Sequence, residues 1–161
     1  MNLPLPEDLF IDFLISAKVH TYASQGGRTN APSLLPGSHQ LEYRRGEMLY
    51  LDIYFGGDFF VGQETVFFQD RAIWCMGYAG GVLDKEAAGL ATEDLYSCLR
   101  HALLQVQAAR PYRGPRLYQE GAFTYQDQSQ GSFERFSGQE TISFQGSTVF
   151  ELHYHGGLIR D

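Results

Sequence analysis

The stretch that decides the fold is GQETVFFQDRAIWCMGYAGGVL at residues 62–83, because the chain repeats it as GQETISFQGSTVFELHYHGGLI at residues 138–159. Nine of these 22 positions are identical, and the similarity continues upstream in YRRGEMLYLD (43–52) and YQEGAFTYQD (118–127). The repeat predicts that one structural unit is written twice within a single domain over residues 1–161. Unit one covers about residues 6–83 and unit two about residues 92–159.

Each unit is expected to form a helix followed by four antiparallel strands. Leucines recur at helical spacing in the second unit, behind Thr92, a residue type that suits the N-cap. Alternating apolar positions and two-residue turn sequences mark the strands. The expected helices are 6–19 and 92–107, and the expected strands are 40–45, 47–55, 59–68, 71–79, 116–119, 121–128, 133–144 and 147–155.

This order of elements predicts an α+β fold: an internal duplication of an α-β-β-β-β unit, with two helices packed on an antiparallel sheet. Two copies are too few for an open repeat array, so we expect them to close around a pseudo-two-fold axis. A connection rich in Gly, Ser, Asn and Pro at residues 21–38 is long for a compact domain and is a candidate lid.

Composition and charge exclude several classes of partner. The formal net charge is −7, and nucleic-acid binding depends on neutralising phosphates, so we expect no nucleic acid to bind this chain. The two cysteines make no disulfide framework, no apolar stretch reaches the roughly 20 residues of a membrane span, and no signal peptide is evident. We therefore expect a cytoplasmic protein that does not bind membranes, with a small-molecule partner and a possible homodimer.

Strand alternation places acidic residues among apolar neighbours. Phe136, Glu140 and Ile142 share one face of their strand, and the repeat transfers that inward face to Glu64. The neighbouring strands add a tyrosine and an aspartate before each glutamate and a tyrosine after it. Each unit thus projects a Tyr–Asp–Glu–Tyr set inward, with Asp52 in unit one and Asp127 in unit two. The set is either a network that holds the fold or the lining of an aromatic cleft between the units.

The leading interpretation is a small-molecule-binding domain of sensor or effector type, whose ligand lies in that cleft. Arg113 or Arg116 would meet an anionic group on the ligand, because guanidinium groups recognise carboxylate and phosphate well. The Gly-Gly pairs at 80–81 and 156–157 are expected to end strands. The predicted ligand-binding residues are Tyr50, Asp52, Glu64, Trp74, Tyr78, Arg113, Arg116, Tyr125, Glu140 and Tyr154.

Two further classes of function stay open. An enzyme, such as a hydrolase or isomerase, would use Glu64 or Glu140 as general base. An interaction module would bind a protein at an open sheet edge or at a polar strand face. His153 and His155 lie two apart beside Glu151, but three ligands on one strand do not converge, so no metal is expected. No motif for a nucleophile or a cofactor occurs, and no cofactor is expected.

The motifs taken together resemble a bacterial domain family of unknown function. They are FLISAKVHTYA (13–23), PGSHQLEYRRG (36–46), YLDIYFGGDFFVGQE (50–64), IWCMGYAGG (73–81), PYRGPRLYQEG (111–121) and HYHGGLI (153–159). Members of that family occur alone or behind an XRE-type helix-turn-helix domain, which implies a sensory or effector role. The first expected helix begins soon after Met1, so we expect no such domain ahead of it here. The resemblance supplies no catalytic residues.

Overall fold

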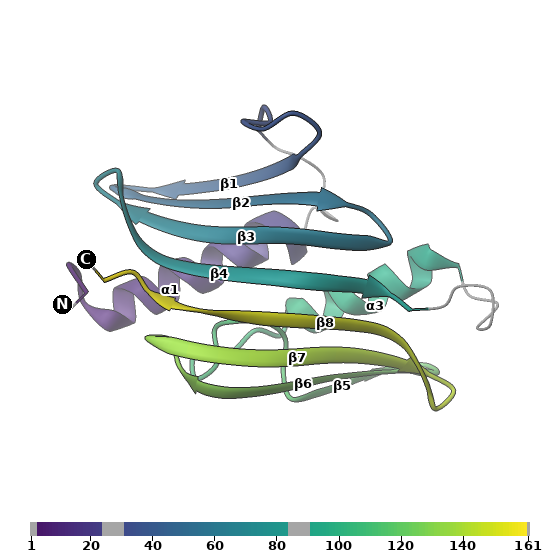
Figure 1. Ribbon diagram of the computed structural model, residues 1–161. Helices are drawn as coiled ribbons and strands as arrows, with labels where there is room; N and C mark the ends of the chain where they lie inside the picture. The colour runs from purple at the N-terminus through teal and green to yellow at the C-terminus, as the bar shows by residue number, and fades with distance from the viewer. Residues whose placement is uncertain (1–2, 24–30, 84–90, 161) are drawn as a thin grey trace.

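The computed structural model describes residues 3–23, 31–83 and 91–160, which form two α-helices and one eight-stranded antiparallel sheet (Figure 1). The α+β class predicted from the sequence is confirmed. The helices are α1 (Glu7–Lys18), continued by the π-helical segment η1 (Val19–Ala23), and α3 (Thr92–Leu103). The strands are β1 (His39–Arg45), β2 (Met48–Gly56), β3 (Phe59–Phe68), β4 (Arg71–Val82), β5 (Leu117–Glu120), β6 (Phe123–Ser132), β7 (Arg135–Phe144) and β8 (Ser147–Leu158).

The sheet has the order β1-β2-β3-β4-β8-β7-β6-β5, so each half is a four-stranded meander and β4 pairs with β8 at the centre. The tight turns occur where the sequence predicts them: Gln69 and Asp70 have φ of 50° and 60°, and Gln145 and Gly146 have φ of 49° and 87°. Positive φ at both turn residues matches the right-handed twist of paired strands. A register shift follows Val66 in β3 and Ile142 in β7, at the matching place in each half.

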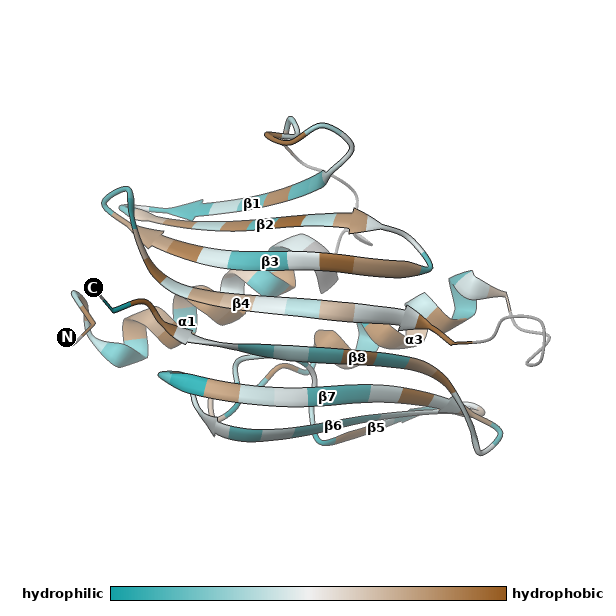
Figure 2. Cartoon of the chain, in the orientation of Figure 1, coloured by the Kyte–Doolittle hydropathy of each residue, from teal (hydrophilic) through white to brown (hydrophobic). Residues whose placement is uncertain are grey.

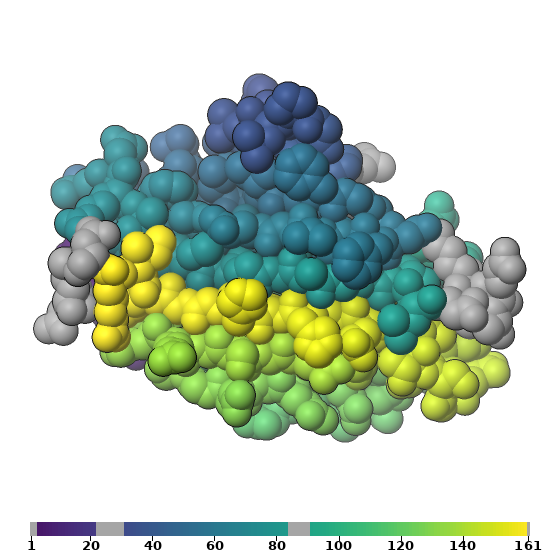
Figure 3. All heavy atoms as spheres, viewed as in Figure 1, coloured from purple at the N-terminus to yellow at the C-terminus, as the bar shows by residue number. Residues whose placement is uncertain are grey.

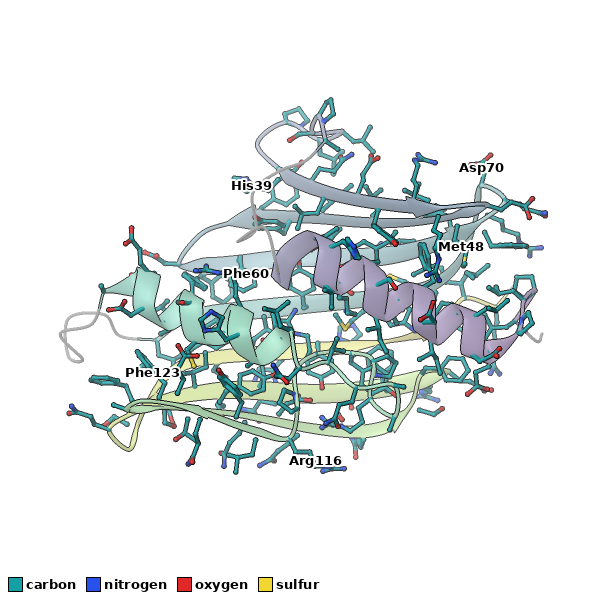
Figure 4. The ribbon with its side chains drawn as sticks, turned by 180° about the vertical axis from the view of Figure 1, so that it is seen from behind. His39, Met48, Phe60, Asp70, Arg116 and Phe123 are labelled. Atoms are coloured by element: carbon teal, nitrogen blue, oxygen red, sulfur yellow. The ribbon has the colours of Figure 1, made fainter. Side chains whose placement is uncertain are left out.

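Both helices lie on the same face of the sheet, and the other face is uncovered (Figures 1 and 4). Hydrophilic residues occur along β3, β7 and β8 (Figure 2). In the space-filling view of that face, the C-terminal strand runs between the strands of the two halves (Figure 3). The strand alternation predicted from the sequence is observed in the burial of the side chains: Phe60, Glu64 and Val66 of β3 are buried, whereas Val61 and Gln63 are exposed.

The core is an aromatic layer between the sheet and the helices. From α1, Phe10 packs on Trp74 with ring centroids 6.2 Å apart, and Trp74 stacks on Phe136 at 5.7 Å. The Trp74 Nε1 donates to the Phe133 carbonyl oxygen at 3.0 Å, so the buried indole has its hydrogen bond. None of the helices in the described ranges is long and apolar enough to span a membrane.

Four local predictions differ from the structure. The second helix ends at Leu103 rather than near residue 107, and its N-cap is Ala91, with Thr92 already inside the helix. Residues 21–23, where the loop was expected to begin, belong to η1. Residues 24–30 of the candidate lid lie outside the described residues. The Gly-Gly pairs lie inside β4 and β8, which continue for one residue beyond each pair, and Gly81 and Gly157 have the positive φ of 157° and 158°. A Cβ on Gly80 or Gly156 would lie 2.2 Å from a backbone oxygen of the paired strand, so these glycines allow β4 and β8 to approach.

Candidate functional site

The first half of the sheet holds a buried acidic pair on the helix-covered face. Asp52 of β2 lies opposite Glu64 of β3, and the Tyr78 hydroxyl on β4 donates to Asp52 Oδ1 at 2.6 Å. Tyr78 reaches across β3 because its partner there is Gly62, where a Cβ would lie 2.4 Å from the phenol oxygen. The strand pairing and one glycine therefore set the Asp–Tyr contact.

Glu64 is neutralised by a lysine from the first helix. Lys18 is the last residue of α1, and its Nζ forms a buried ion pair with Glu64 Oε2. Burial lowers the pKa of Lys18 below its usual range, and the Glu64 charge opposes that shift. The same ammonium lies 5.9 Å from the centroid of the Trp74 ring. Glu64 is consequently committed to a cation of its own chain.

Asp52 is the unusual group of this half. Its side chain is buried, with 3% of the residue exposed, yet its Oδ2 has no hydrogen-bond partner among the described residues. Burial raises the pKa of Asp52 to about 7, and the negative charge of Glu64 adds to the increase, against the Tyr78 hydrogen bond, which lowers it. Asp52 therefore changes its protonation state near neutral pH.

The second half repeats the register with different cations. Glu140 of β7 is fully buried, and Arg113 donates to it twice, from Nε at 3.1 Å and from one terminal nitrogen at 2.5 Å. The Tyr125 hydroxyl donates to the same carboxylate at 2.7 Å and accepts from the Gly114 N–H at 3.0 Å. Three donors already bond the two oxygens of Glu140, so this carboxylate is not available to act as a general base.

Asp127 is the counterpart of Asp52. It lies opposite Glu140 and accepts from the Tyr154 hydroxyl at 2.7 Å through Oδ1. Its Oδ2 forms an ion pair with Arg110, whose Nε also donates to Ser129 Oγ at 2.9 Å. Burial raises the pKa of Asp127 to about 6, while the Tyr154 hydrogen bond and the Arg110 charge lower it. The second aspartate is thus covered on both oxygens by its own chain.

A cavity of about 370 Å³ lies between α3 and the first half of the sheet, and Asp52 lines it. Tyr96 of α3 forms part of its wall, donating to the Gly57 carbonyl at 2.7 Å and lying 6.5 Å from the Phe60 ring. The view from behind shows His39 and Phe60 near α3 (Figure 4). We call this cavity the α3 pocket; its lining is His39, Asp52, Tyr54, Gly56, Gly57, Phe60, Tyr78, Thr92, Glu93, Tyr96, Arg100 and Arg113.

The predicted ligand-binding residues divide into those that line the α3 pocket and those that do not. The pocket brings together Asp52, Tyr78 and Arg113. Tyr50 and Glu64 line a separate cavity of about 20 Å³ beside Lys18, which is roughly the space of one water. Arg116 is exposed and lies at the opposite rim of the molecule (Figure 4). The other four, Trp74, Tyr125, Glu140 and Tyr154, are buried in the core or in the second-half network.

Several residues that line the α3 pocket or the smaller cavity were not predicted, although the sequence carried a signal for some of them. Tyr54 continues the inward alternation of β2 after Asp52, and Lys18 continues the buried stripe of α1 one turn after Leu14. Arg100 and Tyr96 are four apart on one face of α3. Nothing in the sequence alone places that helix over the first half of the sheet, so the pocket wall could not be assembled from it.

Other candidate sites are weaker. Two hollows of about 730 and 580 Å³ lie on the uncovered face, but they are broad and open, and most of their lining residues are partly or fully exposed. His153 bonds Glu151 at 3.1 Å, and in the described parts of the chain no three His, Cys, Asp or Glu side chains gather as a metal site. Among the cavities lined by described residues, the α3 pocket combines a buried charge with enough space for a small molecule.

Comparison with known proteins supports the resemblance noted in the sequence. A family model described as a domain of unknown function, DUF5680, matches residues 52–159, which is more than half of the chain and includes both acidic pairs. Neither the curated proteins nor the solved structures include a significant match. The chain therefore belongs to the DUF5680 family of domains of unknown function.

Proposed function

We propose that the protein is a small-molecule-binding domain of sensor or effector type, and that the α3 pocket is its ligand site. The observation that carries the proposal is Asp52, a buried carboxylate that lines a cavity and has only the Tyr78 hydroxyl as a partner among the described residues. A buried charged group is costly unless it is paired. Asp52 is buried as a residue, but its Oδ2 is not fully enclosed, so a ligand in the cavity could reach this oxygen and bond it.

The size and lining of the pocket agree with this proposal. Small-molecule sites usually have volumes of roughly 300–1,000 Å³ and combine apolar or aromatic walls with a few convergent polar groups. The α3 pocket holds about 370 Å³, with the rings of Tyr54, Phe60 and Tyr96 beside the charges of Asp52 and Arg113. Its lining comes from β1–β4, α3 and the segment before β5, so a ligand there would contact both predicted units.

We also infer that the two halves descend from one duplicated unit related by a pseudo-two-fold axis. The support is the matched register of Asp52 with Glu64 and of Asp127 with Glu140, together with the repeated sequence. On this view the second half keeps its acidic pair, Asp127 and Glu140, as internal structure. The first half presents one member of its pair, Asp52, to a ligand. A sensory role would suit the fusions to XRE-type domains expected of relatives in bacteria.

The experiment is a ligand-observed NMR screen of small polar fragments, confirmed by thermal shift. A ligand at 100 times its Kd adds about 2.7 kcal/mol of stability, which for a chain of this size raises Tm by roughly 5–10 °C. Gly57→Trp is the blocking variant, because Gly57 lines the pocket and a Cβ there meets no atom within 4 Å. Gln119→Trp, on the far edge strand β5, is the matched control.

We expect hits that bind the wild-type chain and Gln119→Trp but not Gly57→Trp. Hits that bind all three equally would place the site elsewhere. A broad screen without hits would count against a small-molecule role.

A further inference from the structure

We propose that the α3 pocket takes a ligand whose recognised group is a planar cation with paired N–H donors, an amidinium or guanidinium, seated on the Asp52 carboxylate. This inference rests on the proposed function and names the chemical class of the ligand. It comes from a comparison within the molecule, because the second half of the sheet already contains such a pair.

The second half supplies the template. Tyr154 donates to Asp127 Oδ1, and the Arg110 guanidinium occupies Oδ2. In the first half Tyr78 donates to Asp52 Oδ1 in the same way, and Oδ2 has no partner among the described residues. In the second half, a guanidinium therefore completes the hydrogen bonding of the buried aspartate. In the first half, the corresponding oxygen belongs to Asp52, which lines the pocket.

The charges around Asp52 leave one positive charge to be supplied. Three buried carboxylates, Asp52, Glu64 and Glu140, share this region with two buried cations. Glu93 and Arg100, which also line the pocket but are less buried, carry opposite charges and leave this balance unchanged. Lys18 is paired with Glu64, and Arg113 is held by two hydrogen bonds on Glu140. Neither cation forms a hydrogen bond or an ion pair with Asp52, and burial raises the pKa of this carboxylate to about 7. A cationic ligand would neutralise it, whereas an anionic ligand would add to the negative charge.

The walls of the pocket favour a planar cation. An amidinium or guanidinium matches a carboxylate with two parallel N–H donors, and it is more weakly hydrated than an ammonium. Its flat face can also lie against aromatic rings, and Tyr54, Phe60, Tyr78 and Tyr96 all line the pocket. The Arg113 guanidinium carbon already lies 5.9 Å from the Tyr78 ring, so that ring accepts such a neighbour.

The test uses three matched probes, namely benzamidine, its neutral isostere benzamide, and benzoate, with affinities measured by chemical-shift titration at pH 8. Methylguanidine and N-methylurea form a second matched pair of smaller size. We expect each cation to bind at least about tenfold more tightly than its neutral isostere, and benzoate to bind weakest. In Asp52→Asn the preference for the cation should disappear.

A mutant-free measurement guards against a variant that fails to fold. Benzamidine stays cationic between pH 5 and 8, so its affinity for the wild-type chain should fall about tenfold per pH unit below pH 7, as Asp52 takes up a proton. Equal binding of benzamidine and benzamide, or tighter binding of benzoate, would overturn the proposal that the ligand is a cation. If Gly57→Trp abolished that binding, the proposed location of the site in the α3 pocket would still be supported. Failure of all five probes to bind would overturn the inference, and hits from the fragment screen would then still support the pocket.

Discussion

Asp52 and Asp127 occupy matched places in the two halves of the sheet, but within the described residues a cation pairs with Asp127 and none pairs with Asp52. The sheet sets what the halves have in common: the register, the glycine opposite each inner tyrosine and the Tyr–Asp contact. The segments outside the sheet set the difference. Arg110 and Arg113 come from the segment between α3 and β5, whereas the buried cation paired with the first-half glutamate, Lys18, comes from α1. The two networks thus share their positions in the sheet and differ in the segments that supply their cations.

The largest effect is expected from removing the cation that closes the second half. Arg113→Met leaves Glu140 fully buried without its partner, which should lower the free energy of unfolding by about 3–5 kcal/mol. Urea unfolding followed by circular dichroism measures this. Arg116→Met, three residues away and exposed, is the control and should change the stability by less than about 0.5 kcal/mol. Similar losses in the two variants would contradict a buried, paired Arg113.

The two aspartates should respond differently to the same substitution. Asp127→Asn leaves the Arg110 guanidinium without its carboxylate and should cost about 3 kcal/mol at pH 8. Asp52→Asn removes a buried charge that no cation of the described chain covers, so it should leave the stability at pH 8 unchanged or increase it. Matched chemical denaturation of both variants measures the difference. Equal destabilisation would show that the two halves are closed alike.

The pH dependence of stability should expose Asp52 directly. Its pKa of about 7 lies above the ordinary aspartate value near 4, so between these values the folded chain holds a proton that the unfolded chain has released. The stabilisation is present at low pH and is lost as the pH rises towards 7, at about 1.4 kcal/mol per pH unit. From pH 5 to pH 7 the wild-type chain should therefore lose about 2–3 kcal/mol relative to Asp52→Asn. Parallel stability curves for the two proteins would contradict the raised pKa.

The smallest effect is expected at Arg100 of α3. This side chain lines the pocket and forms no ion pair within the described residues, so Arg100→Ala should change the stability by less than about 0.5 kcal/mol. Removal of a positive charge near the ligand should tighten benzamidine binding by roughly twofold. Isothermal titration at two salt concentrations checks this, because a screened electrostatic effect should shrink as salt rises. Weaker binding in the variant would indicate that Arg100 holds the ligand itself.

Much of the sheet could be predicted from the sequence because its signals are local. Alternation with a period of two identifies which residues face inward, and this placed Glu64 and Glu140 on the covered face before the structure was known. Short turns with residues that tolerate positive φ fixed the hairpins at 69–70 and 145–146. These features depend on neighbours in the chain, so one sequence suffices to identify them.

The site was less predictable because it depends on contacts between distant segments. Lys18 and Glu64 are 46 positions apart, and Arg113 reaches Glu140 from a segment with no periodic pattern. The sequence identified the Tyr–Asp–Glu–Tyr sets but treated them as equivalent, and it ranked the glutamates above Asp52 as chemical groups. A carboxylate is available to a ligand only if no cation of the chain neutralises it. Tertiary packing alone determines which cation pairs with which carboxylate.

The most direct test of this account is a carbon-detected NMR titration of the Asp52 and Asp127 side-chain carboxyls, with and without saturating benzamidine. We expect Asp52 to titrate near pH 7 in the free protein, and benzamidine to lower the pKa of Asp52 by at least one unit while leaving that of Asp127 unchanged. The second aspartate serves as an internal control because Arg110 already occupies it. If benzamidine moved neither pKa, or moved both equally, the claim that one half is open and the other closed would be contradicted.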